Sequence, residues 1–201
     1  MILQEDVYKF KKMKGMNYMT TANKLTILRV ILVPVFMAFL MMEPMWCQIA
    51  ALIIFIIASA TDGIDGYIAR HYNQITTFGK FMDPLADKML TTAAFLVLLE
   101  HGRVSSIAVM IVLAREFMVA GIRMLAGADG NVIAASMLGK IKTVSQMVAI
   151  IAAIILMNPI FADVPETAQF ITDILVWIST AITVISGIDY LIKNKYILQN
   201  K

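Results

Sequence analysis

The chain has 201 residues, of which 60% are hydrophobic and only 15% are charged, with a formal net charge of +3. Ordinary soluble domains are about 45–50% apolar and about 25% charged, so the composition argues against a soluble α/β enzyme and against a disordered chain. Because a membrane-spanning helix needs about 20 apolar residues, the length predicts about six spans and no separate soluble domain of normal size. The one cysteine, Cys47, excludes an internal disulfide framework and a cysteine-based zinc site.

Apolar stretches separated by turn-type sequences predict an all-α, polytopic membrane protein with six transmembrane helices. In chain order these helices are expected over residues 25–42, 45–69, 83–99, 104–125, 137–157 and 168–192. Glu43-Pro44, His101-Gly102, Gly127–Asn131 and Asn158-Pro159 are turn-type sequences that separate them. We therefore expect an N-terminal extension, residues 1–22, and a six-helix transmembrane domain, residues 23–201.

The basic residues predict the orientation of these helices. All but one of the 17 Lys and Arg residues lie before the first span, around the second and fourth connections, or after the last span; the exception is Arg103. The positive-inside rule then places both termini and these connections in the cytoplasm. Residues 1–15 do not resemble a secretory signal. They fit either an interfacial helix held by anionic lipid or a mobile extension.

Four aspartates gather where the second and third predicted spans meet. Asp62 and Asp65 lie three residues apart at the end of one span, and Asp83 and Asp87 lie four apart at the start of the next. At these spacings each pair projects from one face of a helix, and a short connection makes the two helices antiparallel neighbours. Four carboxylates at one place require protonation or cations, and oxygen-only ligands suit Mg²⁺, Mn²⁺ or Ca²⁺. The alternative is that the aspartates only cap helix ends at the membrane surface.

The spacing around these aspartates is similar to a known signature. The residues Asp62-x2-Asp65-Gly66-x2-Ala69-Arg70-x8-Gly79-x3-Asp83-x3-Asp87 resemble the complete motif of the CDP-alcohol phosphatidyltransferase family. Softer marks at Asn23–Arg29, Ala114–Phe117 and Leu138–Thr143 are similar to the phosphatidylglycerophosphate synthase group of that family. The chain departs from the group at Ala22, where a proline is usual.

The resemblance implies the CDP-alcohol phosphotransferase fold and a metal-dependent enzyme of anionic phospholipid biosynthesis. Its reaction would transfer the phosphatidyl group of CDP-diacylglycerol to sn-glycerol 3-phosphate, giving phosphatidylglycerophosphate and CMP. Two ions of Mg²⁺ or Mn²⁺ would be held by Asp62, Asp65, Asp83 and Asp87, with Asp83 and Asp87 catalytic and Asp87 either a ligand or the general base. CDP-diacylglycerol would be bound by Asp62, Gly66, Ala69, Arg70 and Gly79. The resemblance also implies a homodimer in the cell (inner or plasma) membrane with a cytoplasmic active site, and no nucleic-acid partner.

Four cations further along the chain are candidates for binding the phosphate of the acceptor. Arg115 and Arg123 lie in the fourth predicted span, and Lys140 and Lys142 open the fifth, all toward the cytoplasmic side. Charged residues inside a span rarely face lipid, and arginine and lysine bind phosphate. In the alternative reading, Arg115 and the adjacent Glu116 form a structural pair and the lysines extend to lipid headgroups.

Other functions stay open at this point. A different acceptor would make the chain a cardiolipin, phosphatidylserine or phosphatidylinositol phosphate type of synthase. A cation transporter could use the aspartates as a pathway, although the outer halves of the predicted spans contain no matching cluster of acidic residues. A non-catalytic lipid-binding protein would not need all four aspartates.

Overall fold

The computed structural model describes residues 21–71, 77–128, 133, 136–195 and 197, and within these ranges the side chains of 21–25, 62–71, 77–85, 87 and 128 are not described. The described part is helical and contains no strand, which confirms the predicted all-α class. Its elements are α2 (Thr21–Leu40), α3 (Met45–His71), α4 (Thr77–Glu100), α5 (Ser106–Ala128), α6 (Met137–Leu156), the 3₁₀ helix η2 (Pro159–Phe161) and α7 (Pro165–Lys193). Residues 1–20 of the predicted N-terminal extension lie outside the described residues.

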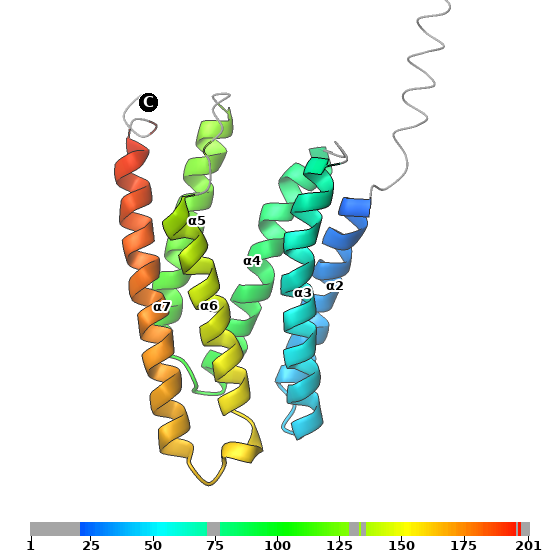
Figure 1. The fold of residues 1–201 in the computed structure, drawn as a ribbon, viewed down its shortest axis with the longest axis vertical. Coiled ribbons are helices and arrows are strands. Elements are labelled where there is room, and N and C mark those ends of the chain that lie inside the picture. The colour runs from blue at the N-terminus through cyan, green and yellow to red at the C-terminus, as the bar shows by residue number, and fades with distance from the viewer. Residues whose placement is uncertain (1–20, 72–76, 129–132, 134–135, 196, 198–201) are drawn as a thin grey trace, which may run out of the picture.

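The helices run up and down in an elongated bundle (Figure 1). The beginnings of α2, α4 and α6 and the ends of α3, α5 and α7 lie together at the upper end in that view, and the short connections α2–α3, α4–α5 and α6–α7 lie at the other. The most extensive contacts join α6 to α7, α2 to both α3 and α4, and α5 to α7. The aspartate-bearing segments of α3 and α4 are therefore at the same end of the bundle as the ends of α5 and α7 and the beginning of α6.

Aromatic and small apolar side chains fill the main core. Phe36 of α2 and Phe55 of α3 are fully buried with their ring centroids 5.6 Å apart. Alanines such as Ala94 of α4 and Ala153 of α6 allow the helices to approach closely around them. A smaller cluster joins α5 to α7 through Val119, Ile122, Ala126 and Tyr190, together with Ile197.

The outer surface of the bundle is rich in large apolar side chains. On α7, Phe170 and Ile185 are well exposed, whereas the face packed against the other helices carries Thr172, Ser179 and Thr183. Such a distribution, with the polar residues inside, is the opposite of that in a water-soluble helix and is typical of helices that face lipid. Among the described residues, α6 and α7 are long and apolar enough to cross a membrane, and shorter apolar stretches run over Thr26–Leu40 and Met45–Thr61. Six membrane spans stay a prediction.

The predicted helices correspond one for one to the observed ones, with shifted ends. The largest shift is at α4, which begins at Thr77, six residues before the predicted start, because the helix continues beyond the hydrophobic stretch that marked it. The predicted turn at His101-Gly102 is present, and Gly102 has φ +68°, a conformation that favours glycine. The 3₁₀ helix η2 was not predicted; Asn158 caps it by accepting a hydrogen bond from the backbone N–H of Ile160.

Candidate active site

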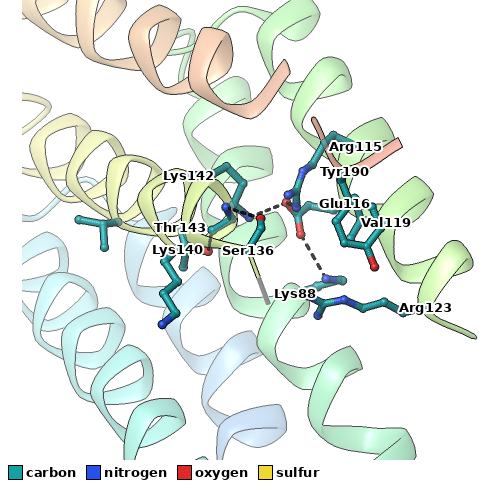
Figure 2. Close-up of a pocket in the computed structure, with 12 residues that line it drawn as sticks. Lys88, Arg115, Glu116, Val119, Arg123, Ser136, Lys140, Lys142, Thr143 and Tyr190 are labelled. Atoms are coloured by element: carbon teal, nitrogen blue, oxygen red, sulfur yellow. Dashed lines mark hydrogen bonds and ion pairs between the residues drawn. The ribbon is translucent and has the colours of Figure 1, made fainter. Parts of the chain in front are cut away.

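A cavity of about 370 Å³ opens near the end of the bundle where the aspartate-bearing helix segments lie. It lies between α4, α5, α6 and α7, and five of its lining residues are cations. The lining residues are Lys88, Arg115, Glu116, Val119, Arg123, Ser136, Gly139, Lys140, Lys142, Thr143, Val144 and Tyr190. Figure 2 shows most of these side chains around the cavity.

Glu116 is the acidic residue among the cations that line the cavity. Its Oε1 lies 2.5 Å from Nζ of Lys142 and 3.1 Å from Nη1 of Arg115, and its Oε2 lies 3.1 Å from Nζ of Lys88. The side chain of Glu116 is 12% exposed and that of Lys142 is 6% exposed, so these ion pairs are largely removed from solvent. Three positive charges and one negative charge leave the group of four with a formal charge of +2. An anion that enters the cavity therefore meets an excess of positive charge.

Arg115 is fixed by contacts with α7. Its Nη2 donates a hydrogen bond of 2.8 Å to Oγ of Ser186, which is fully buried. Its aliphatic stem lies so close to Gly187 that a Cβ at that position would be 3.0 Å from Cγ of Arg115. The guanidinium is thereby held in one place on the cavity wall, although its Nε, buried from water, has no hydrogen-bond partner.

The N-terminus of α6 forms another part of the wall. Ser136 caps this helix, and its Oγ accepts a hydrogen bond from the backbone N–H of Gly139 at 3.0 Å. The first turn of a helix carries unpaired N–H groups and a partial positive charge, both of which favour an anion nearby. Lys140 lies at the end of this first turn and Lys142 lies in the next turn, and both add full charges. On the α7 side, the guanidinium carbon of Arg123 lies 5.8 Å from the centroid of the Tyr190 ring.

The structure thus brings together the four cations that the sequence singled out for the acceptor, Arg115, Arg123, Lys140 and Lys142. The alternative structural pair is also present, since Arg115 and Glu116 form an ion pair. The sequence pattern did not mark Lys88 as a site residue, because Lys88 was counted only among the charges that orient the helices. Nor did it mark Ser136, Ser186 and Tyr190, whose proximity depends on contacts between helices distant in the chain. The signal that could have found Lys88 was Glu116, a carboxylate inside a predicted span, where it needs cationic partners.

The predicted metal and CDP-diacylglycerol residues can be placed only along the backbone. Asp62, Asp65, Gly66, Ala69 and Arg70 lie in α3, and Gly79, Asp83 and Asp87 lie in α4. Their side chains lie outside the described residues. In the part of the chain whose side chains are described, no group of three or more His, Cys, Asp or Glu residues could hold a metal ion. Lys88, which directly follows Asp87 in α4, connects this segment to the cavity through Glu116.

Comparison with protein families decides the classification. The sequence model of the family described as CDP-alcohol phosphatidyltransferase matches residues 19–185. The chain belongs to the CDP-alcohol phosphatidyltransferase family.

Relatives in this family cover most of the chain. A Bacillus subtilis (strain 168) protein named CDP-diacylglycerol–glycerol-3-phosphate 3-phosphatidyltransferase is 40% identical over 185 residues, which cover 86% of this chain and 93% of the relative. A Rickettsia felis protein of the same name is 37% identical over 174 residues, covering 84% of this chain and 91% of the relative. An Escherichia coli (strain K12) protein of that name is 38% identical over 130 residues, covering 63% and 71%. Residues 19–185 include the whole aspartate motif and all four predicted acceptor cations.

Proposed function

We propose that this phosphatidyltransferase transfers the phosphatidyl group of CDP-diacylglycerol to sn-glycerol 3-phosphate, giving phosphatidylglycerophosphate and CMP. The observation that carries the proposal is the cationic cavity around Glu116, which lies at the same end of the bundle as the aspartate-bearing segments of α3 and α4. Glycerol 3-phosphate is a small soluble dianion, so its binding requires fixed positive charge beside the reacting groups. The names of the relatives support this choice of acceptor.

In this proposal the acceptor phosphate is bound by Arg115, Arg123, Lys140 and Lys142. Arg115 presents a planar guanidinium that suits a phosphate, and Ser186 and Glu116 hold it in place. Lys140 and Arg123 are exposed at the cavity rim and reach an incoming anion first, whereas Lys142 lies deeper. Electrostatic attraction by this group also raises the local concentration of the acceptor.

The liponucleotide is assigned to the aspartate motif. Asp62, Asp65, Asp83 and Asp87 form an oxygen-only donor set on two helices, and such a set fits hard divalent cations such as Mg²⁺ or Mn²⁺. Two such ions, when bound, would neutralise charge on the pyrophosphate and on the departing CMP. We assign Gly66, Ala69, Arg70 and Gly79 to the CDP-diacylglycerol pocket. Asp87 is either a ligand or the base that removes the proton from the acceptor hydroxyl.

The arrangement in the membrane is part of the same proposal. We propose a multi-pass protein of the cell membrane, working as a homodimer, with both termini and the cavity on the cytoplasmic side. The apolar outer surface of the bundle and the single-sided distribution of Lys and Arg support it. A liponucleotide in the inner leaflet keeps its chains in lipid while its pyrophosphate reaches the end of the bundle where α3 and α4 carry the aspartates.

An acceptor panel tests the proposed function. Purified protein in detergent is given CDP-diacylglycerol, Mg²⁺ or Mn²⁺, and in separate reactions glycerol 3-phosphate, serine, inositol phosphate or phosphatidylglycerol. Among these reactions, we expect CMP release only in the one that contains glycerol 3-phosphate. Release with one of the other acceptors in its place would assign the chain to a different synthase of the family.

A further inference from the structure

We propose that Glu116 is a positioning residue that fixes where the acceptor phosphate sits relative to α4. The proposal rests on the proposed function, because it concerns the same cavity. Simple anion binding does not explain the presence of Glu116, because a carboxylate repels the phosphate that the cavity is expected to bind.

The burial of Glu116 makes its presence costly. A charge that is largely removed from solvent loses its hydration, and this loss is repaid only when the charge is well paired. Glu116 is paired with Lys88, Arg115 and Lys142 at 3.1 Å or less. Without it, three cations would face one another across a small cavity and their repulsion would move the side chains apart. The carboxylate therefore holds together a group that would otherwise separate.

The two carboxylate oxygens of Glu116 accept hydrogen bonds from cations on three different helices. Oε1 accepts from Lys142 of α6 and from Arg115 of α5, and Oε2 accepts from Lys88 of α4. Arg115 in turn donates to Ser186 of α7. One carboxylate thus links the four helices that surround the cavity. Each lysine ammonium has three N–H donors and gives one to Glu116, which leaves donors for a phosphate in a fixed position.

The contact with Lys88 connects the phosphate position to the aspartate helix. Lys88 directly follows Asp87 and lies five residues after Asp83 in α4. In the proposed reaction the acceptor hydroxyl must come within about 3–3.5 Å of the reacting phosphorus, and displacements of about 1 Å cost much of the rate. Because Lys88 and Lys142 meet on the same carboxylate, Glu116 sets the distance from the phosphate end of the acceptor to α4.

Steady-state kinetics of Glu116→Gln test this role. The substitution keeps the size of the side chain and removes its charge. We expect the KM for glycerol 3-phosphate to rise and kcat to fall, each by about tenfold or more. The KM for CDP-diacylglycerol should change by less than about twofold, because a positioning role is confined to the acceptor. Glu116→Asp, which keeps the charge on a shorter stem, should give values between those of the wild type and Glu116→Gln.

Lys88→Met provides a second test at a more tolerant position, since this side chain is 24% exposed. It should also raise the KM for glycerol 3-phosphate and lower kcat. If Glu116 acts through Lys88, the double variant should lose much less than the product of the two single losses. Asp189→Asn is the matched control: it breaks an ion pair with Lys193 on α7, outside the cavity lining. Its kinetics should stay within about twofold of the wild type, since exposed ion pairs contribute little.

The outcomes separate this inference from the proposed function. A wild type that releases no CMP with glycerol 3-phosphate overturns the proposed function itself. An active wild type together with a Glu116→Gln variant whose KM for glycerol 3-phosphate is unchanged or lower overturns only the positioning role, because Glu116 would then be neutral or a mere competitor of the phosphate. If Glu116→Gln does not fold, Lys88→Met decides, and an unchanged KM for glycerol 3-phosphate in that variant overturns the inference.

Discussion

Glu116 of α5 and Lys142 of α6 form a close ion pair, with Oε1 and Nζ 2.5 Å apart. Both side chains are largely buried, and the same oxygen also accepts a hydrogen bond from Arg115. The pair therefore does two things at once: it joins two helices, and it places a cation on the wall of the cavity. Substitutions that separate these two effects are the most informative ones.

Lys142→Met and Lys140→Met form a matched pair for this purpose. Both lysines line the cavity near the start of α6, but only Lys142 is buried against Glu116. Removing one partner of a buried ion pair costs about 3–5 kcal/mol, and since Glu116 keeps two other partners we expect about 1–3 kcal/mol for Lys142→Met. Lys140→Met should cost less than about 0.5 kcal/mol. Unfolding in detergent measures both, and equal losses would contradict the burial described for Lys142.

Gly187→Ala tests whether the close contact with α7 holds the Arg115 side chain in place. An added Cβ would lie 3.0 Å from Cγ of Arg115 and 3.5 Å from Cε of Met118. The guanidinium of Arg115 is held by Ser186 and Glu116. If the added Cβ displaces the aliphatic part of the Arg115 side chain, the guanidinium must therefore move as well. We expect the KM for glycerol 3-phosphate to rise about fivefold or more. Stability should change by less than about 1 kcal/mol, since alanine also favours the helix.

Gly121→Ala is the control for that substitution. At Gly121 of α5 an added Cβ would meet no heavy atom within 4 Å. The variant should be more stable by about 0.5–1 kcal/mol and have wild-type kinetics. If both glycine variants raise the KM for glycerol 3-phosphate equally, the effect does not come from contact with Arg115.

The aspartate motif predicts a strict requirement for a divalent cation. Asp83→Asn removes one carboxylate charge while keeping the side-chain size, so CMP release should fall by at least about a hundredfold with the fold intact. Chelation of divalent ions from the wild type should abolish CMP release, and Mg²⁺ or Mn²⁺ should restore it. Full activity in the presence of chelator would rule out the assigned metal role.

The predicted orientation can be measured by cysteine labelling. Cys47 is the one native cysteine, so Cys47→Ser gives a background without thiols. In that background, Asp163→Cys lies in the exposed connection before α7 and Lys195→Cys lies just after the end of α7. A membrane-impermeant maleimide added to intact cells should label Asp163→Cys, and should label Lys195→Cys only after permeabilisation. The reverse pattern would place the cavity on the outer side.

Much of this architecture was predictable from the sequence because the chain is apolar in helix-length runs. Those runs, separated by turns such as His101-Gly102, located each of the six helices in the described part of the chain. The up-and-down arrangement followed from short connections and agrees with Figure 1. The helix ends were less accurate, as at Thr77, because a helix can extend past its hydrophobic stretch.

The details of the cavity were harder to predict because they depend on how each helix is rotated about its axis. The cost of placing charge in a span pointed to Arg115. Arg123, Lys140 and Lys142 were found from their place toward the predicted cytoplasmic side, next to the aspartates. Two partners of Glu116, Lys88 and Lys142, are 28 and 26 residues away in the chain, and Ser186 is 71 residues from Arg115. Packing between helices decides which of these side chains come into contact. The residue pattern along a single helix does not reveal these contacts.

The most direct test of the proposed function is transfer of radiolabel from sn-[¹⁴C]glycerol 3-phosphate into lipid. Purified wild-type protein in detergent with CDP-diacylglycerol and Mg²⁺ or Mn²⁺ should move the label into the organic phase as phosphatidylglycerophosphate, with one CMP released for each labelled lipid formed. CMP release without labelled lipid, or neither product from folded protein, would contradict phosphatidyl transfer to glycerol 3-phosphate.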